Sequence, residues 1–117
     1  MLPFRTRLTL EQRRREFQLI TMKRPDLVPI IVERAGRDAP RMDKEKFLVP
    51  DDLTAAQFAF VLRRRLHMTS SEALFLLCNG LPLSGDTTLS QVRARTVQSD
   101  DGFLYVSYSL ENAFGEF

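Results

Sequence analysis

The fold is decided by one stretch, Lys46-Phe-Leu-Val-Pro-Asp-Asp-Leu-Thr-Ala-Ala-Gln-Phe-Ala-Phe-Val-Leu-Arg-Arg-Arg-Leu-His67. Its beginning, 46–50, is typical of a strand that a proline closes. Thr54 and Gln57 have the spacing of a capping box, in which each side chain satisfies a free backbone N–H, so a helix is predicted at about 55–67. The apolar residues of this helix recur at helical spacing and are expected to pack on a sheet; they are Phe58, Val61, Leu62 and Leu66.

The same Thr-x-x-Gln signature occurs at Thr9–Gln12 and at Thr88–Gln91. It predicts two further helices, at about 10–23 and 89–95. The first should end before Arg24-Pro25, because a proline pushes the preceding residue out of the helical region.

The other expected elements are a helical turn near 3–7, strands at 27–33, 73–79 and 103–109, a short strand between the third strand and the last helix, a loop at 34–44 and a mobile loop at 96–102. Pro29 lacks an N–H and should therefore lie near the start of its strand or on an unpaired side. The pair Asn79-Gly80 indicates a tight turn after the third strand.

Two strands, a crossing helix and two more strands make an α+β fold, a ubiquitin-like β-grasp with an additional N-terminal helical segment. We expect three parts: a helical extension at 1–24 packed on the domain, the β-grasp domain at 25–111, and a flexible tail at 112–117.

Composition favours one soluble domain in a reducing, cytoplasmic compartment. The chain has 117 residues, 44% hydrophobic and 27% charged, which is ordinary for a globular protein with a single core. The single cysteine excludes an intrachain disulfide. No secretory signal is apparent and no apolar run approaches the ~20 residues of a membrane-spanning helix, so any membrane attachment must be acquired.

The charge is divided unevenly along the chain. Residues 1–24 hold seven Lys/Arg and two Glu, a balance of +5, whereas the remainder has a balance of −3. A basic arm of this kind could bind anionic lipid, nucleic acid or an acidic protein surface. An equally good interpretation is a solvated helix face that aids solubility. The seven cations are Arg5, Arg7, Arg13, Arg14, Arg15, Lys23 and Arg24.

Within this arm we expect Arg13 or Arg14 to lie nearest the apolar stripe of the helix, with its charged end in water, and Arg15 to face solvent. A further hypothesis is an RNA-binding or tubulin-binding protein that uses these cations and associates with the cytoskeleton. It ranks low because we expect no exposed aromatic residues interleaved with these cations for base stacking.

Nothing in the sequence favours catalysis. The only histidine, His67, falls at a helix end, and the only cysteine, Cys78, falls in an apolar strand where cysteine behaves as a small hydrophobe. No zinc cluster, metal-loop spacing or glycine-rich phosphate loop is present. We therefore expect no enzyme activity, no cofactor and no metal.

The end of the chain is Asn112-Ala-Phe114-Gly115-Glu116-Phe117. Glycine has no Cβ, so an extended Phe-Gly tail can enter a narrow active site of another enzyme. The alternative is an ordinary frayed terminus.

Most of the chain resembles the autophagy ubiquitin-like modifiers, the GABARAP and light-chain-three family. The segments that carry the resemblance are Pro25–Glu33, Lys46–Pro50, Asp52–Thr54, Gln57-Phe58, Arg63–His67 and Phe103–Ser109. The resemblance implies that a processing cysteine protease cuts after Gly115, beyond Phe114, and releases Glu116-Phe117. Activating and conjugating enzymes would then join the new carboxylate to phosphatidylethanolamine, placing the protein on the autophagosome membrane. The alternative is an adaptor of the same fold that is never conjugated.

The resemblance also implies a docking site for cargo receptors that carry an aromatic-x-x-aliphatic motif, bound as an added strand. Its aromatic pocket would involve Glu16, Ile20, Pro29, Ile31, Lys46, Leu48 and Phe103. Its aliphatic pocket would involve Phe47, Val49, Pro50, Leu53, Phe58, Val61 and Arg65. The chain departs from the family pattern at Leu10, at Arg24, at Gly102, which stands where a bulky residue is usual, and in a loop one residue shorter between the first two strands.

Overall fold

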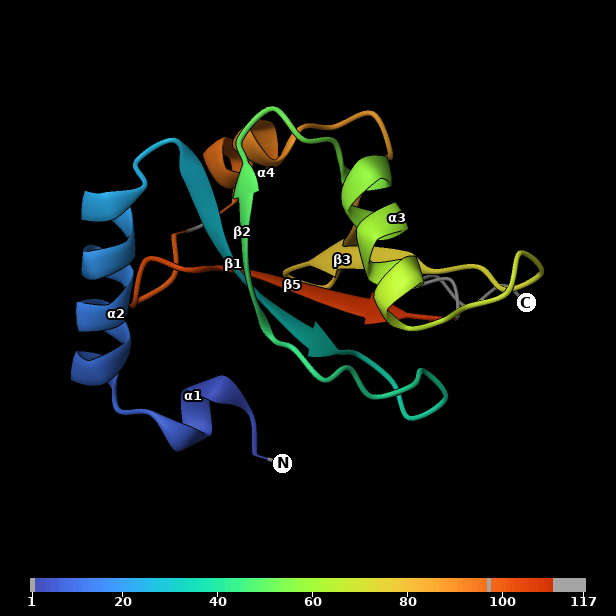
Figure 1. The fold of residues 1–117 in the computed structure, drawn as a ribbon, viewed down its shortest axis with the longest axis horizontal. Coiled ribbons are helices and arrows are strands. Elements are labelled where there is room, and N and C mark those ends of the chain that lie inside the picture. Colours follow the sequence, from blue (N-terminus) through green and yellow to red (C-terminus); the bar gives the residue numbers. More distant parts are fainter. Residues whose placement is uncertain (1, 97, 111–117) are drawn as a thin grey trace.

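The computed structural model describes residues 2–96 and 98–110 and has helices and strands in the predicted order (Figure 1). The elements are α1 (Phe4–Arg7), α2 (Leu10–Lys23), β1 (Leu27–Arg34), β2 (Lys46–Pro50), α3 (Ala55–Arg65), β3 (Phe75–Cys78), β4 (Leu81–Pro82), α4 (Leu89–Arg95) and β5 (Leu104–Ser109). The predicted α+β class is confirmed. The division of the chain into three parts stays a prediction.

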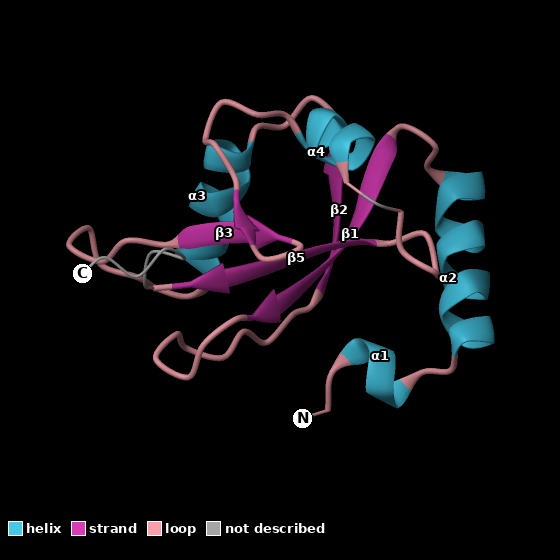
Figure 2. Ribbon diagram, turned by 180° about the vertical axis from the view of Figure 1, so that it is seen from behind, coloured by secondary structure: helices cyan, strands magenta, loops and turns pink. Residues whose placement is uncertain are grey.

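The strands form one five-stranded sheet in the order β2-β1-β5-β3-β4 (Figure 2). β1 and β5 are parallel, and the other neighbouring pairs are antiparallel. Pro29 lies near the start of β1, as predicted: it pairs with Leu48 of β2 and precedes Ile30, where the pairing with β5 begins. Because β2 stands at the end of this order, it is an edge strand of the described sheet, with β1 as its neighbour.

All three predicted capping boxes are present. In each, the threonine hydroxyl accepts a hydrogen bond from the glutamine backbone N–H, and the glutamine side chain accepts one from the threonine N–H. α3 ends at Arg65, two residues earlier than predicted. The chain turns at His67, whose φ of 56° lies in the left-handed region, and the Met68 N–H bonds back to the Arg63 carbonyl at 3.1 Å. This is the Schellman pattern of helix termination.

The sheet carries a hydrophobic cluster on each face. The main core joins β1, β2, β3 and β5 to α3 and α4, and Phe58 and Leu62 of α3 are fully buried in it. The second cluster is formed by Phe4, Ile31 and Phe103, with Phe17 and Ile20 of α2 packed against them.

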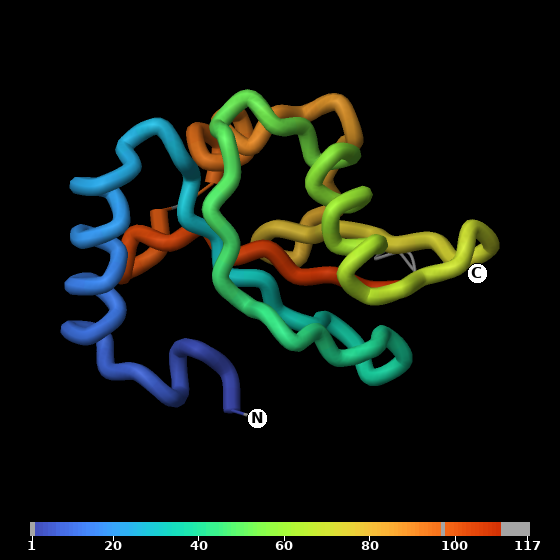
Figure 3. The backbone as a smooth tube through the Cα atoms, in the orientation of Figure 1, coloured from blue at the N-terminus to red at the C-terminus, as the bar shows by residue number. Residues whose placement is uncertain are grey.

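β1 is buried at five successive positions because both of its faces are covered. Figure 3 follows the chain from α2 through a short connection back into β1. One core prediction is wrong: Val61 is 42% exposed, because it lies off the stripe of α3 that faces the sheet.

Candidate functional site

The predicted docking residues gather around the edge strand β2, which runs between α2 and α3 (Figure 1). No strand pairs with the outer edge of β2 in the part of the chain that the structure describes. Burial alternates along β2: Phe47 and Val49 are buried, whereas Leu48 and Pro50 are exposed. Successive side chains of a strand point to opposite faces, so β2 contributes to two separate surfaces.

The predicted aromatic-pocket residues lie on the face of the sheet that α2 covers. Ile31 belongs to the cluster on this face, and its strand neighbours Ile30 and Val32 belong to the main core. Ile31 pairs with Lys46, and Pro29 pairs with Leu48.

Lys46 forms an ion pair with Glu16 of α2, which bridges the helix and the edge strand. Burial lowers the pKa of Lys46, and the nearby charge of Arg7 acts in the same direction. Leu48 is 41% exposed, whereas Phe103 and Ile31 are buried. Leu48 and Lys46 therefore form the accessible part of this surface, and Phe103 and Ile31 lie beneath it.

The predicted aliphatic-pocket residues lie on the other face, between β2 and α3. Phe47 and Phe58 meet edge to face with ring centroids 5.7 Å apart, and both are core residues together with Val49. The accessible members are Pro50, Val61 and Arg65, with Leu53 half-buried. The Arg65 Nε donates to Asp43 Oδ1 at 2.9 Å, which ties α3 to the segment before β2.

A buried ionic network next to Phe103 was missed by sequence reasoning. The Arg13 Nη1 lies 2.6 Å from Asp101 Oδ2 and 3.3 Å from Asp100 Oδ1. Tyr105 also donates to Asp101 Oδ2, and Asp101 Oδ1 accepts from the Phe103 N–H at 2.9 Å and from the Ser99 hydroxyl.

Two predictions are corrected by this network. The charged end of Arg13 is buried in the ion pair, where we expected it in water. Residues 99–102, expected as part of a mobile loop, are anchored to α2 and β5 through Asp100 and Asp101. No local pattern signals the Arg13–Asp101 pair, because the two residues lie 88 positions apart.

The same network shifts two pKa values. Burial would raise the pKa of Asp101, but hydrogen bonds from Tyr105, Arg13, Ser99 and the Phe103 N–H outweigh it and hold that pKa below its ordinary value. Burial and the Asp101 carboxylate raise the pKa of Tyr105. Asp101 is therefore held as a carboxylate and Tyr105 as a neutral donor.

Two hollows open elsewhere on the described surface. The larger, about 840 Å³, lies between α1 and the segment that precedes β2, and Lys46 is the one predicted pocket residue in its lining. The smaller, about 380 Å³, lies between α3, β3 and β4 and is lined by none of the predicted residues. The predicted docking residues, Lys46 apart, therefore lie outside both hollows, on the two faces of β2 and its neighbours.

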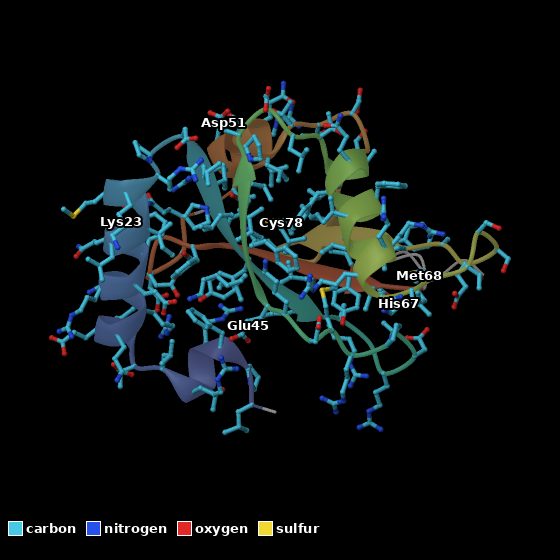
Figure 4. All side chains as sticks on the ribbon, in the orientation of Figure 1. Lys23, Glu45, Asp51, His67, Met68 and Cys78 are labelled. Atoms are coloured by element: carbon cyan, nitrogen blue, oxygen red, sulfur yellow. The ribbon has the colours of Figure 1, made fainter. Side chains whose placement is uncertain are left out.

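The two residues considered for catalysis, Cys78 and His67, are labelled in Figure 4. Cys78 is buried, its thiol donates to the Tyr105 carbonyl, and burial raises its pKa. His67 is exposed at the end of α3. Within residues 2–96 and 98–110, no group of three or more His, Cys, Asp or Glu side chains is placed to hold a metal ion.

Gly115 and Phe114, predicted as the site of processing, lie outside the described residues. No helix in the described part of the chain has the length and apolar character needed to cross a membrane.

Comparison with known proteins supports the resemblance. The family described as "Autophagy protein Atg8 ubiquitin like" matches residues 12–115. Autophagy-related protein 8 of Mycosarcoma maydis is 40% identical over 97% of this chain and 96% of its own length. Autophagy-related protein 8c of Arabidopsis thaliana is 43% identical over 96% of this chain and 94% of its own length. Autophagy-related protein 8 of Kluyveromyces lactis is 39% identical over 97% of this chain and 91% of its own length. The chain therefore belongs to the Atg8 family of ubiquitin-like autophagy proteins.

Proposed function

We propose that this protein is an autophagy modifier that is cleaved after Gly115 and conjugated through the new carboxylate to phosphatidylethanolamine. Family membership supports the proposal, and the family match ends at residue 115, immediately before Glu116-Phe117. In the proposed sequence a processing cysteine protease hydrolyses the Gly115–Glu116 peptide bond. An activating enzyme then adenylates the Gly115 carboxylate, releasing pyrophosphate from ATP, and its cysteine thiolate displaces AMP to form a thioester.

The acyl group next passes to a cysteine of a conjugating enzyme by exchange of one thioester for another. The amine of phosphatidylethanolamine finally displaces that thiol and forms an amide. All of this chemistry belongs to partner enzymes, and the chain supplies the carboxylate. The product would be held on the autophagosome membrane by its lipid.

We further propose that the edge of β2 binds cargo receptors through an aromatic-x-x-aliphatic segment. The observation that carries this proposal is the separation of the predicted residues onto two faces of β2, whose outer edge pairs with no other strand of the described residues. A peptide that adds a strand beside β2 presents alternate side chains to opposite faces. Two anchors three residues apart therefore point to opposite faces, the aromatic one toward Lys46 and Leu48 and the aliphatic one toward Val61.

The conjugation proposal is tested by co-expressing the chain with the protease and the activating and conjugating enzymes of an Atg8 pathway. Mass spectrometry should show loss of Glu116-Phe117 and then the added mass of phosphatidylethanolamine on Gly115. The docking proposal is tested by calorimetry with an aromatic-x-x-aliphatic peptide and with a control in which both anchors are alanine. Binding of the motif peptide without any trimming or lipid would favour the alternative, an adaptor that is not conjugated.

A further inference from the structure

Phe17 of α2 lies directly on the backbone of Gly102. Gly102 has a φ of +95°, in the left-handed region that favours glycine. A Cβ built on Gly102 would lie 2.6 Å from each of two ring atoms of Phe17, much closer than carbon atoms approach without displacing one another. A side chain at position 102 would therefore force the Phe17 ring, and α2 with it, away from the sheet.

The Phe17 ring is also held by its other neighbours. It meets Phe103 edge to face, with centroids 5.4 Å apart, and the Arg93 guanidinium lies 5.7 Å from its centroid. The backbone beneath is fixed as well, because the Gly102 N–H donates to the Ser99 hydroxyl at 3.1 Å. The Phe17 ring is thus held by Phe103, Arg93 and Gly102. Because Gly102 has no Cβ, the ring can lie against its backbone, and this contact sets how closely Phe17 approaches the sheet.

The contact has a consequence for the neighbouring docking surface. Ile20 lies three residues after Phe17 on α2 and packs in the same cluster as Ile31 and Phe103. In the proposed docking site, α2 would supply one wall of the aromatic pocket through Ile20, and the sheet would supply the other through Leu48. The spacing between α2 and the sheet therefore controls the width of that pocket.

We propose that the contact of Phe17 with Gly102 sets the spacing between α2 and the sheet and thereby the size of aromatic anchor that a docked peptide can present. Phe17 is then a positioning residue that acts through Ile20 and Phe103. This inference rests on the proposed docking of an aromatic-x-x-aliphatic peptide beside β2.

The test compares Gly102→Ala alone with Gly102→Ala in the Phe17→Ala background. Calorimetry is carried out with three peptides that differ only in a Trp, Tyr or Phe anchor. Gly102→Ala alone should weaken binding ~10-fold or more for at least one anchor and change the ranking of the three. In the Phe17→Ala background the same change should have an effect under ~2-fold, because the clashing ring is absent.

Gly80→Ala is the matched control. Gly80 also has a positive φ, +79°, but a Cβ built there meets nothing within 4 Å. This variant has the same kind of backbone strain without a clash and should bind all three peptides as the wild type does.

A readout without peptide separates the contact from the docking proposal. Amide hydrogen exchange in α2 should become ~10-fold faster in Gly102→Ala when Phe17 is present, with α3 unchanged. Equal effects of Gly102→Ala in both backgrounds would overturn the inference, and so would an equal loss for all three anchors. If the wild type binds none of the peptides, the docking proposal and the pocket role fail together, and the exchange data still decide whether the contact holds α2.

Discussion

Asp101→Asn tests the buried ion pair that joins α2 to the segment before β5. The Asp101 side chain is 0% exposed and the Arg13 side chain 9% exposed, so water cannot replace either partner. Removing one member of a buried pair costs about 3–5 kcal/mol, because the other charge is left uncompensated. Asp100 offsets part of this loss, since its carboxylate lies 3.3 Å from the same Arg13 nitrogen. We therefore expect the free energy of unfolding at pH 7 to fall by about 2–4 kcal/mol.

The assay is urea denaturation followed by circular dichroism, with Asp100→Asn as the matched control. The Asp100 side chain is 56% exposed, so its replacement should cost less than about 1 kcal/mol. The double variant Arg13→Met/Asp101→Asn should recover part of the loss, because no unpaired charge then remains buried.

The effect should also depend on pH in a defined direction. The pKa of Asp101 is lowered in the folded state, so its stabilising contribution is complete above about pH 4 and is lost as the pH falls through the folded-state pKa. The difference between wild type and Asp101→Asn should therefore shrink below about pH 4. A loss at pH 7 no larger than that of Asp100→Asn, or a gap that stays constant down to about pH 3, would refute the reasoning.

Four further predictions concern the edge strand, the basic helix and the tail. Leu48→Ala should weaken the binding of a motif peptide ~30-fold, measured by calorimetry. The free energy of unfolding should change little, because Leu48 is 41% exposed. If Leu48→Ala binds the peptide as the wild type does, Leu48 does not belong to the site. Phe47→Ala should instead lower the free energy of unfolding by about 3–5 kcal/mol, because Phe47 is 5% exposed in the core. Arg15→Glu should change the free energy of unfolding by less than about 0.5 kcal/mol, because Arg15 is exposed, but should reduce co-sedimentation with anionic vesicles at low salt. If the variant and the wild type bind the vesicles equally, the basic helix serves only solubility. Gly115→Ala should block both trimming and lipid addition in the co-expression assay with an unchanged circular dichroism spectrum; normal lipidation would contradict the proposed route.

Local signals in the sequence predicted the elements well. Each capping box placed a helix start correctly because the hydrogen bonds involved join residues three apart. Asn79-Gly80 predicted its turn because both residues adopt a positive φ, 54° and 79°, as a type I′ turn requires. The alternation within Lys46–Pro50 likewise predicted that β2 would expose two different surfaces.

Features that depend on contacts between distant segments could not be predicted in the same way. Arg13 and Asp101, and also Phe17 and Gly102, meet only after α2 has docked on the sheet. Helical spacing alone placed Val61 toward the core, although the structure leaves it 42% exposed. For the candidate site, the sequence suggested which residues take part, but only the tertiary structure separates accessible ones such as Leu48 from those buried beneath.

The uneven charge of the chain is explained by attraction between its own parts. Cations of the arm meet carboxylates of the other part, as in Arg5–Glu33, Arg7–Glu45 and Arg13–Asp101. Arg24 pairs with Asp26, and Arg14 donates only to the backbone carbonyl of Asp100. Among the described residues, the cations of the arm without an ion pair are therefore Arg14, Arg15 and Lys23.

Four of the seven cations of the arm are thus matched by carboxylates of the remainder of the chain, which leaves few to bind a nucleic acid backbone, so the structure favours an arm that is held by the domain itself. Salt screens exposed pairs more than buried ones. Rising ionic strength should therefore loosen α1, whose pairs through Arg5 and Arg7 reach the surface, before it loosens α2, whose Arg13 is buried against Asp101.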